Sequence, residues 1–408
     1  MMVRLARRME DLRASDIREM LKFTQAPEVI SFAGGLPAPE CFPVEELKEA
    51  SIRLLQQAGR QAMQYSTTEG HLPLRRWIAA RMRQRDGVDV KPDQILVTSG
   101  SQQGLDLSGK LFLDEGDVVF CESPTYLAAI SALQAFRPCF VAVPTDDDGM
   151  VIEELEQRLR GNPRAKLIYV IPDFQNPTGR TWSFERRRRL VELVRRFRVP
   201  VVEDCPYVEL RYEGEPIPSL MSLDRDGLVV ALGTFSKIFC PGMRIGWLAA
   251  APHLFEKYVI LKQSADLHTS TVSQMQIATY LETCDIDANI TRIREIYHRR
   301  RDVMVAALER ELPAGVRFTR PKGGMFLWVE LPRHLSARDL LVTCIERQVV
   351  FVPGGSFFPN GGGEHTFRLN FSNMPEERIV EGIQRLAVAI REFLARRPAF
   401  EPRAAAAG

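Results

Sequence analysis

Short apolar runs alternate with amphipathic segments over most of the chain, from about residue 46 to about residue 290. Four apolar runs have the length of buried strands: 94–98, 167–171, 198–204 and 228–232. The segment that ends near Phe197 carries Leu190, Leu193 and Val194 at helical spacing. This alternation predicts an α/β fold with a mostly parallel, doubly wound sheet and helices on both of its faces.

The pattern changes beyond residue 290. A long charged helix is expected over 291–312, followed by helix and strand segments of a smaller α+β domain. We therefore expect a large domain at 46–290 and a small domain at 291–397. The N-terminal segment 1–45 would join the small domain and cover the substrate, and the tail 398–408 would be disordered. Closure of the two lobes would complete a site between them.

A lysine follows the last of the apolar runs. The end of a buried strand would desolvate the Lys237 amine and lower its pKa, which makes the amine nucleophilic near neutral pH. Such amines form Schiff bases with carbonyl compounds, pyridoxal phosphate (PLP) among them. Arg244, seven residues later, offers a planar fork for a phosphate. The ordinary alternative is a lysine that extends from a strand end beside a surface arginine.

Two further runs also end in polar residues. Asp204 ends the run at 198–204, where a carboxylate would face a ligand cleft and could keep a PLP ring nitrogen protonated. A helix cap or turn is the commoner role of Asp in such a loop. Asn176 follows the run at 167–171 and precedes Pro177, which restricts its backbone. Its amide could donate to the ring phenolate oxygen.

The first apolar run enters a Ser/Gly turn and then a helix expected at about 102–112. The amides at the start of such a helix, together with the Ser101 hydroxyl, form a site suited to phosphate. Serine is also the ordinary residue at a helix N-terminus, so this turn alone is weak evidence.

In this order, the four pieces resemble the fold-type I PLP enzymes, and the chain is similar to the class I and II aminotransferases over nearly its whole length. Five further segments resemble the branch with the 2-aminoadipate (LysN-type) and kynurenine aminotransferases: 30–40, 64–70, 266–269, 321–326 and 351–355. The resemblance implies PLP as cofactor. It also implies transfer of an amino group from an L-amino acid to a 2-oxo acid, with 2-oxoglutarate as the expected acceptor, in a ping-pong reaction.

The same resemblance implies roles around the cofactor ring. Lys237 would hold PLP as a Schiff base and then act as general acid and base, and Asp204 would pair with the pyridinium nitrogen. Tyr207 and Asn176 would bind the phenolate oxygen, and Tyr126 would stack on the ring.

It further implies a phosphate site and a partner. The phosphate would be held by Ser101, Gln102, Thr234, Ser236 and Arg244. Tyr65 would reach the phosphate of a neighbouring subunit, so a homodimer with shared active sites is expected.

Substrate recognition is implied at both ends of the chain. Arg368 would pair with the substrate α-carboxylate, beside Gly35 and Asn176. Arg18 matches an arginine that pairs with a distal carboxylate in the family, which favours 2-aminoadipate or glutamate as amino donor. Arg18 lies in the segment 14–19, which resembles a helix that covers the substrate side chain in the family and also accepts leucine or aromatic side chains. Asp173 stands where a small residue is common, and its negative charge would alter the preference for acidic substrates.

Two other classes of function stay open. A PLP-dependent lyase, decarboxylase or synthase could use the same fold, because fold does not fix the reaction. A regulator that senses PLP would carry an N-terminal winged-helix domain, and we expect none because Gly34 and Gly35 lie so near Met1.

The composition of the chain bears on its partners, its location and the presence of a metal site. The net charge of +2 favours neither nucleic acid nor an anionic membrane as a partner, and no apolar stretch has the roughly 20 residues of a membrane span. The arginine run at 186–189 is interpreted as the polar face of a helix. Seven scattered cysteines and an N-terminus without an apolar block favour a cytoplasmic location. Six histidines without a close Cys or Asp grouping predict no metal site.

Overall fold

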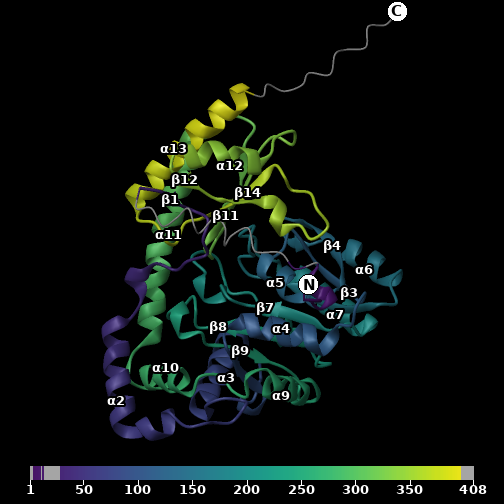
Figure 1. Ribbon diagram of the computed structural model, residues 1–408, viewed down its shortest axis with the longest axis vertical. Coiled ribbons are helices and arrows are strands. Elements are labelled where there is room, and N and C mark those ends of the chain that lie inside the picture. Colours follow the sequence, from purple (N-terminus) through teal and green to yellow (C-terminus); the bar gives the residue numbers. More distant parts are fainter. Residues whose placement is uncertain (1–2, 11, 13–27, 397–408) are drawn as a thin grey trace, which may run out of the picture.

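The computed structural model describes residues 3–10, 12 and 28–396. A central eight-stranded sheet forms the core of its larger part (Figure 1). In sheet order its strands are β2 (Ile95–Thr98), β9 (Gly246–Ala249), β8 (Val229–Thr234), β7 (Val201–Asp204), β6 (Ala165–Val170), β3 (Val118–Ser123), β4 (Cys139–Asp146) and β5 (Gly149–Met150). Strands β8, β7, β6, β3 and β4 are parallel neighbours, whereas β9 and β5 pair antiparallel.

Helices cover both faces of this sheet. One apolar cluster joins α4 (Ser101–Phe112), α5 (Leu127–Gln134) and α9 (Pro252–Asp266) to one face. Clusters on the opposite face contain α3 (Leu72–Asp86), α6 (Ile152–Arg160), α7 (Phe184–Phe197), α8 (Leu220–Leu223) and α10 (Thr271–Thr283). Strands buried on both faces are apolar without alternation, which explains the continuous runs in the sequence. The prediction of a mostly parallel, doubly wound α/β fold is confirmed.

The smaller part contains an antiparallel sheet of order β10-β11-β14-β13. Its strands are β10 (Arg317–Phe318), β11 (Phe326–Glu330), β14 (Thr366–Asn370) and β13 (Val352–Pro353). Strand β1 (Ile30–Ser31) pairs in parallel with β12 (Val349–Val350), so the start of the described main segment lies beside the C-terminal third of the chain. Helices α12 (Ala337–Glu346) and α13 (Glu376–Arg396) pack around these strands (Figure 1).

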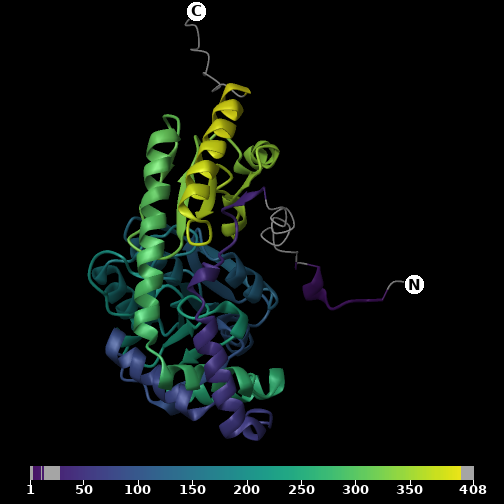
Figure 2. The same ribbon diagram turned by 90° about the vertical axis from the view of Figure 1, so that its left-hand side faces the viewer.

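Two long helices lie along the side of the molecule, and one of them, α11, connects the two parts (Figure 2). Helix α2 (Val44–Ala62) packs on α10, and α11 (Ile286–Glu311) runs from the larger part to lie along α13 (Figure 2). The Asp285 side chain accepts hydrogen bonds from the first amides of α11, which fixes the start of this helix ahead of the expected residue 291. The domain boundary predicted at 290 thus falls inside one continuous helix. The proposed boundaries stay predictions.

Short 3-10 helices complete the described elements: η1 (Arg7–Met9), η2 (Pro39–Cys41), η3 (Pro92–Gln94), η4 (Val208–Leu210), η5 (Pro241–Met243) and η6 (Gly354–Phe357). Among the described helices, none is both long and apolar enough to cross a membrane. The arginine run lies on α7, where Arg186, Arg188 and Arg189 form ion pairs with nearby acids. Arg187, by contrast, is fully buried.

Candidate active site

The carboxyl ends of β6, β7 and β8 meet beside the smaller part, and Lys237 follows β8. Every residue of β8 is buried, and this strand leads directly into the loop that carries the lysine. The Lys237 amine donates a hydrogen bond to the backbone oxygen of Gly35 at 2.9 Å. Burial, helped by the charges of Arg368 and Arg244, lowers the pKa of Lys237 to about 8. An appreciable fraction of the amine is therefore uncharged near neutral pH.

Asp204 ends β7 and leaves one carboxylate oxygen without a partner. Its Oδ2 accepts a hydrogen bond from the Tyr169 hydroxyl at 2.8 Å. Its Oδ1 is buried and has no hydrogen-bond donor among the described residues. Burial raises the pKa of Asp204 to about 6, against the opposing effect of the Tyr169 hydroxyl. A buried acceptor in this state suits a ligand N–H with positive charge.

Tyr169 is a residue to which the sequence analysis gave no role. In the sheet, Tyr169 of β6 lies opposite Val202 of β7, so the two side chains share a face. Val202 and Asp204 are two residues apart on one strand and share that face as well. The positions of Tyr169 and Asp204 along their two strands could have indicated this contact. The contact can be predicted only when the register between the two strands is known.

Arg368 on β14 is the buried cation of the site. One of its terminal nitrogens donates to Asn176 Oδ1 at 2.8 Å, and the other donates to the Ala33 backbone oxygen at 2.6 Å. Its guanidinium carbon lies 4.1 Å from the ring centre of Phe326 and 5.2 Å from that of Phe357. Burial lowers the pKa of Arg368 to about 10. Both rings were missed from the sequence, because neither lies in a polar motif.

Gly35 connects the lysine and arginine sides. A Cβ atom at this position would lie 3.1 Å from the Phe326 ring, closer than most side-chain contacts. Glycine therefore lets the backbone approach both that ring and the Lys237 amine. Asn176 uses its amide oxygen for Arg368, which leaves its N–H groups for another acceptor.

Two tyrosines lie within the electrostatic influence of these charged groups. Burial raises the pKa of Tyr126 to about 12, and the charges of Asp204, Arg368 and Arg244 all affect it. Tyr207 is buried, and its ring meets Phe326 edge to face at 5.8 Å. Burial also raises the pKa of Tyr207, while a hydrogen bond with Asn176 opposes that rise. Both hydroxyls are therefore protonated near neutral pH.

The predicted phosphate residues gather at the start of α4. Ser101 is its first residue, and the Arg244 guanidinium lies against Gly100, where a Cβ atom would come within 2.5 Å of it. Thr234 is the last residue of β8, and its Oγ1 donates to Ser236 Oγ on the following loop at 2.9 Å. The Gln102 side chain, also at this end of α4, donates to the Ala128 backbone oxygen. Helix amides, hydroxyls and a guanidinium together suit a phosphate.

The donor and acceptor set fits PLP at both ends. Asp204 Oδ1 is an unmet acceptor for the ring nitrogen, and Lys237 offers an amine of lowered pKa for the aldehyde. The N-terminus of α4 and Arg244 suit the phosphate.

Two predicted site residues are not part of this group. Tyr65 is 80% exposed, and its ring contacts that of His268 edge to face. Arg18 lies outside the described residues.

The interpretation of Asp173 as an added negative charge near the cofactor loop needs correction. Its carboxylate pairs with Arg187 at 2.9 Å and with Arg211 at 2.7 Å, and all three side chains are largely buried. Two arginines distant in the sequence therefore neutralise this carboxylate.

One grouping of possible metal ligands also escaped the sequence analysis. Glu213, His298 and Asp302 bring their ligand atoms within 4.8 Å of one another. Arg301 forms ion pairs with both carboxylates, so a guanidinium already provides their cationic partner.

Comparisons with known proteins agree with this geometry. The family model described as aminotransferase class I and II matches residues 28–386. Aromatic-amino-acid aminotransferase 1 of Thermococcus litoralis is 47% identical over 385 residues, which cover 93% of this chain and 92% of that protein. The 2-aminoadipate transaminase of Thermus thermophilus is 45% identical over 387 residues, covering 94% and 96% of the two chains.

A solved structure matches over the same range. It is LysN, an α-aminoadipate aminotransferase of Thermus thermophilus, complexed with N-(5'-phosphopyridoxyl)-L-leucine. It superposes with a TM-score of 0.90 at 43% identity and covers 96% of this chain and 98% of that chain.

Proposed function

Because this chain belongs to the class I and II aminotransferases, we propose that Lys237, Asp204 and Arg368 form its active site. The protein is a PLP-dependent aminotransferase, and its substrates are amino acids and oxo acids. The single observation that supports this location most strongly is the orphan oxygen of Asp204. The charge of this buried carboxyl acts on Tyr126 together with Arg368 and Arg244, and the same two arginines lower the pKa of Lys237.

Each residue has a distinct task in the proposed reaction. Arg368 binds the substrate α-carboxylate, while its bond to Asn176 orients that amide toward the ring oxygen. Lys237 Nζ takes the proton from the substrate α-carbon, which its lowered pKa permits. Asp204 keeps the ring nitrogen protonated. Bound PLP supplies the electron sink that stabilises negative charge at that carbon.

The proposed amino donors are 2-aminoadipate, glutamate, leucine or aromatic amino acids, with 2-oxoglutarate as acceptor. Support comes from the relatives, which include aromatic-amino-acid and 2-aminoadipate aminotransferases. The neutralisation of Asp173 by Arg187 and Arg211 also supports acidic donors, because no unbalanced carboxylate would repel them.

An absorbance spectrum of the purified protein tests the function. L-2-aminoadipate, L-glutamate and L-leucine are added separately, followed by 2-oxoglutarate. A cofactor band that shifts to shorter wavelength with a donor, and returns with the oxo acid, is the expected result and ranks the donors. A band that none of these donors converts would favour a lyase or another PLP reaction instead.

A substitution tests the proposed distal contact. Arg18→Ala should reduce activity on 2-aminoadipate and glutamate more than activity on leucine, because only the acidic donors carry a distal carboxylate. Equal losses on all three would remove Arg18 from the site.

We also propose a homodimer in which Tyr65 reaches the neighbouring subunit. The exposed Tyr65 ring, close to the exposed side chain of Met63, supports this arrangement. Chains carrying Tyr65→Ala and chains carrying Lys237→Ala can be refolded together. Activity above that of either chain alone is expected, because each mixed dimer would contain one intact site. No gain on mixing would argue for independent sites.

A further inference from the structure

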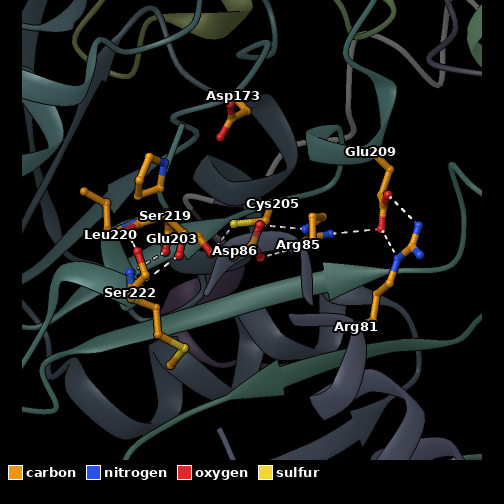
Figure 3. A network of polar contacts seen from close by, with 12 residues as sticks. Arg81, Arg85, Asp86, Asp173, Glu203, Cys205, Glu209, Ser219, Leu220 and Ser222 are labelled. Atoms are coloured by element: carbon orange, nitrogen blue, oxygen red, sulfur yellow. Dashed lines mark hydrogen bonds and ion pairs between the residues drawn. The ribbon is translucent and has the colours of Figure 1, made fainter. Parts of the chain in front are cut away.

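The segment 203–209 carries side chains of the candidate active site and side chains of a separate polar network (Figure 3). Asp204 and Tyr207 belong to the candidate active site. Glu203 and Glu209 belong to the polar network drawn in Figure 3, and both are buried. The cofactor-side residues are therefore carried by a short segment that is anchored near each end.

Glu209 is held by arginines from two helices. Its carboxylate accepts two hydrogen bonds from Arg81, at 2.9 and 3.0 Å, and one from Arg85 at 3.3 Å. Both arginines lie one turn apart on α3 and face Glu209 in Figure 3. Arg294 of α11 approaches the same carboxylate at 3.6 Å and donates to the Glu209 backbone oxygen at 2.5 Å.

The Glu209 carboxylate supplies negative charge to the three arginines that surround it. Burial alone would raise its pKa, but Arg85, Arg81 and Arg294 together lower it, so the carboxylate is charged at neutral pH. Arg81 has a second acidic partner in Asp287, and Arg85 has one in Asp86. A two-oxygen acceptor is needed to receive both nitrogens of the Arg81 fork.

The bonds of Glu209 fix the turn that carries Tyr207. Tyr207 is the residue before η4, and its backbone oxygen accepts from the Leu210 amide at 2.8 Å. The Leu210 oxygen accepts in turn from the Gly324 amide at 2.8 Å, on the segment that leads to Phe326. A shift of Glu209 would therefore move the Tyr207 backbone relative to the ring that it contacts.

We propose that Glu209 is a positioning residue, which aims the Tyr207 hydroxyl by tying its turn to α3 and α11. This inference rests on the proposed function, in which Tyr207 binds the ring oxygen of PLP. Glu209 touches neither substrate nor cofactor. It acts through Tyr207 alone, and α11 brings the smaller part of the molecule into the same set of contacts.

The test is a double-mutant cycle on the holoenzyme, with the pH midpoint of the cofactor absorbance as its readout. Tyr207→Phe should raise that midpoint by about one pH unit, because one hydrogen bond to the ring oxygen is lost. Glu209→Gln should raise it by about half as much. In the double variant the midpoint should equal that of Tyr207→Phe.

Asp117→Asn is the matched control. Asp117 is as buried as Glu209 and accepts from Arg164 and the Asp114 amide, far along the chain from Tyr207. It should lower the thermal midpoint without moving the absorbance midpoint. If Glu209→Gln does not fold, Arg81→Lys removes the two-pronged contact, and a smaller rise in the same direction is expected.

Two results would overturn the inference. One is a variant at Glu209 or Arg81 that is destabilised like Asp117→Asn but keeps the wild-type absorbance midpoint. The other is a double variant in which the two shifts add, because Glu209 would then act independently of Tyr207. Absence of a cofactor band in the wild type would instead reject the proposed function, and the inference with it.

Discussion

Glu203 and Asp204 are neighbours on β7, yet they lie on opposite faces of the sheet and have different hydrogen bonding. Burial raises the pKa of Glu203 to about 7 and that of Asp204 to about 6. Glu203 accepts hydrogen bonds from the Leu220 and Met221 amides at 2.7 and 3.0 Å. Asp204 has one partner, Tyr169, and one oxygen without any among the described residues.

The difference separates a structural acid from the acid that we propose for the active site. A raised pKa is common to both acids, so it does not distinguish them. An unmet acceptor does, since proteins rarely bury one without a partner. Glu203 anchors α8 to the sheet, whereas Asp204 keeps its capacity for a ligand.

The largest expected effect concerns Asp204. Asp204→Asn should lower kcat/KM by on the order of 10³-fold, because an amide cannot balance the charge of a protonated ring nitrogen. The thermal midpoint of the cofactor-free protein should stay the same or rise, since a buried charge without a full set of partners is removed. Steady-state kinetics and thermal unfolding measure both. If Asp204→Asn lost stability as well as activity, Asp204 would also have a structural role, and it would no longer differ from Glu203 in this respect.

Glu203→Gln should show the opposite pattern. The amide nitrogen of Gln would face a backbone N–H of α8, so the free energy of unfolding should fall by about 1–3 kcal/mol. Activity should stay within about threefold of the wild type. The substitution lies on the other face of the sheet, so it should change the activation free energy by less than about 1 kcal/mol. Urea unfolding at constant pH provides the measurement, and a kcat/KM loss as large as that of Asp204→Asn would contradict it.

The pH dependence of stability separates the two acids further. Each carboxyl has a folded pKa above its ordinary value of 4.5 or 3.8, so the folded protein binds these protons more tightly. Stability of the cofactor-free protein should therefore fall as pH rises from about 4 to about 7. Asp204→Asn and Glu203→Gln should each flatten part of that slope in urea titrations. Added PLP should remove the Asp204 part, because the ring nitrogen favours the charged carboxylate.

Tyr169→Phe should have the smallest effect in free energy. It removes the hydroxyl that donates to Asp204 Oδ2, so this oxygen loses its hydrogen bond from Tyr169. We expect kcat/KM to fall by about fivefold and the Kd for PLP to rise by a similar factor, for a loss of about 1 kcal/mol. Titration of the cofactor-free protein with PLP measures the latter. An unchanged Kd would mean that Tyr169 does not tune Asp204.

The sequence was sufficient to predict the candidate site residues that lie at the ends of strands. Lys237 and Asp204 could be located because buried runs end at polar residues, and parallel strands bring their carboxyl ends to one edge. The sequence did not predict the contact of Tyr169 with Asp204, because that contact depends on strand register. It also did not predict the two aromatic rings that lie against Arg368. The ion pairs of Asp173 with Arg187 and Arg211 were beyond reach because they depend on tertiary packing alone.

The aromatic enclosure of Arg368 has a consequence for the response to salt. Arg368 is 1% exposed, and its guanidinium lies against the rings of Phe326 and Phe357, so little of it is accessible to counterions from bulk solution. Mobile ions weaken attraction between exposed charges over a Debye length of about 8 Å at physiological ionic strength, but they screen buried pairs much less. Binding of an α-carboxylate at this position should therefore be nearly independent of ionic strength.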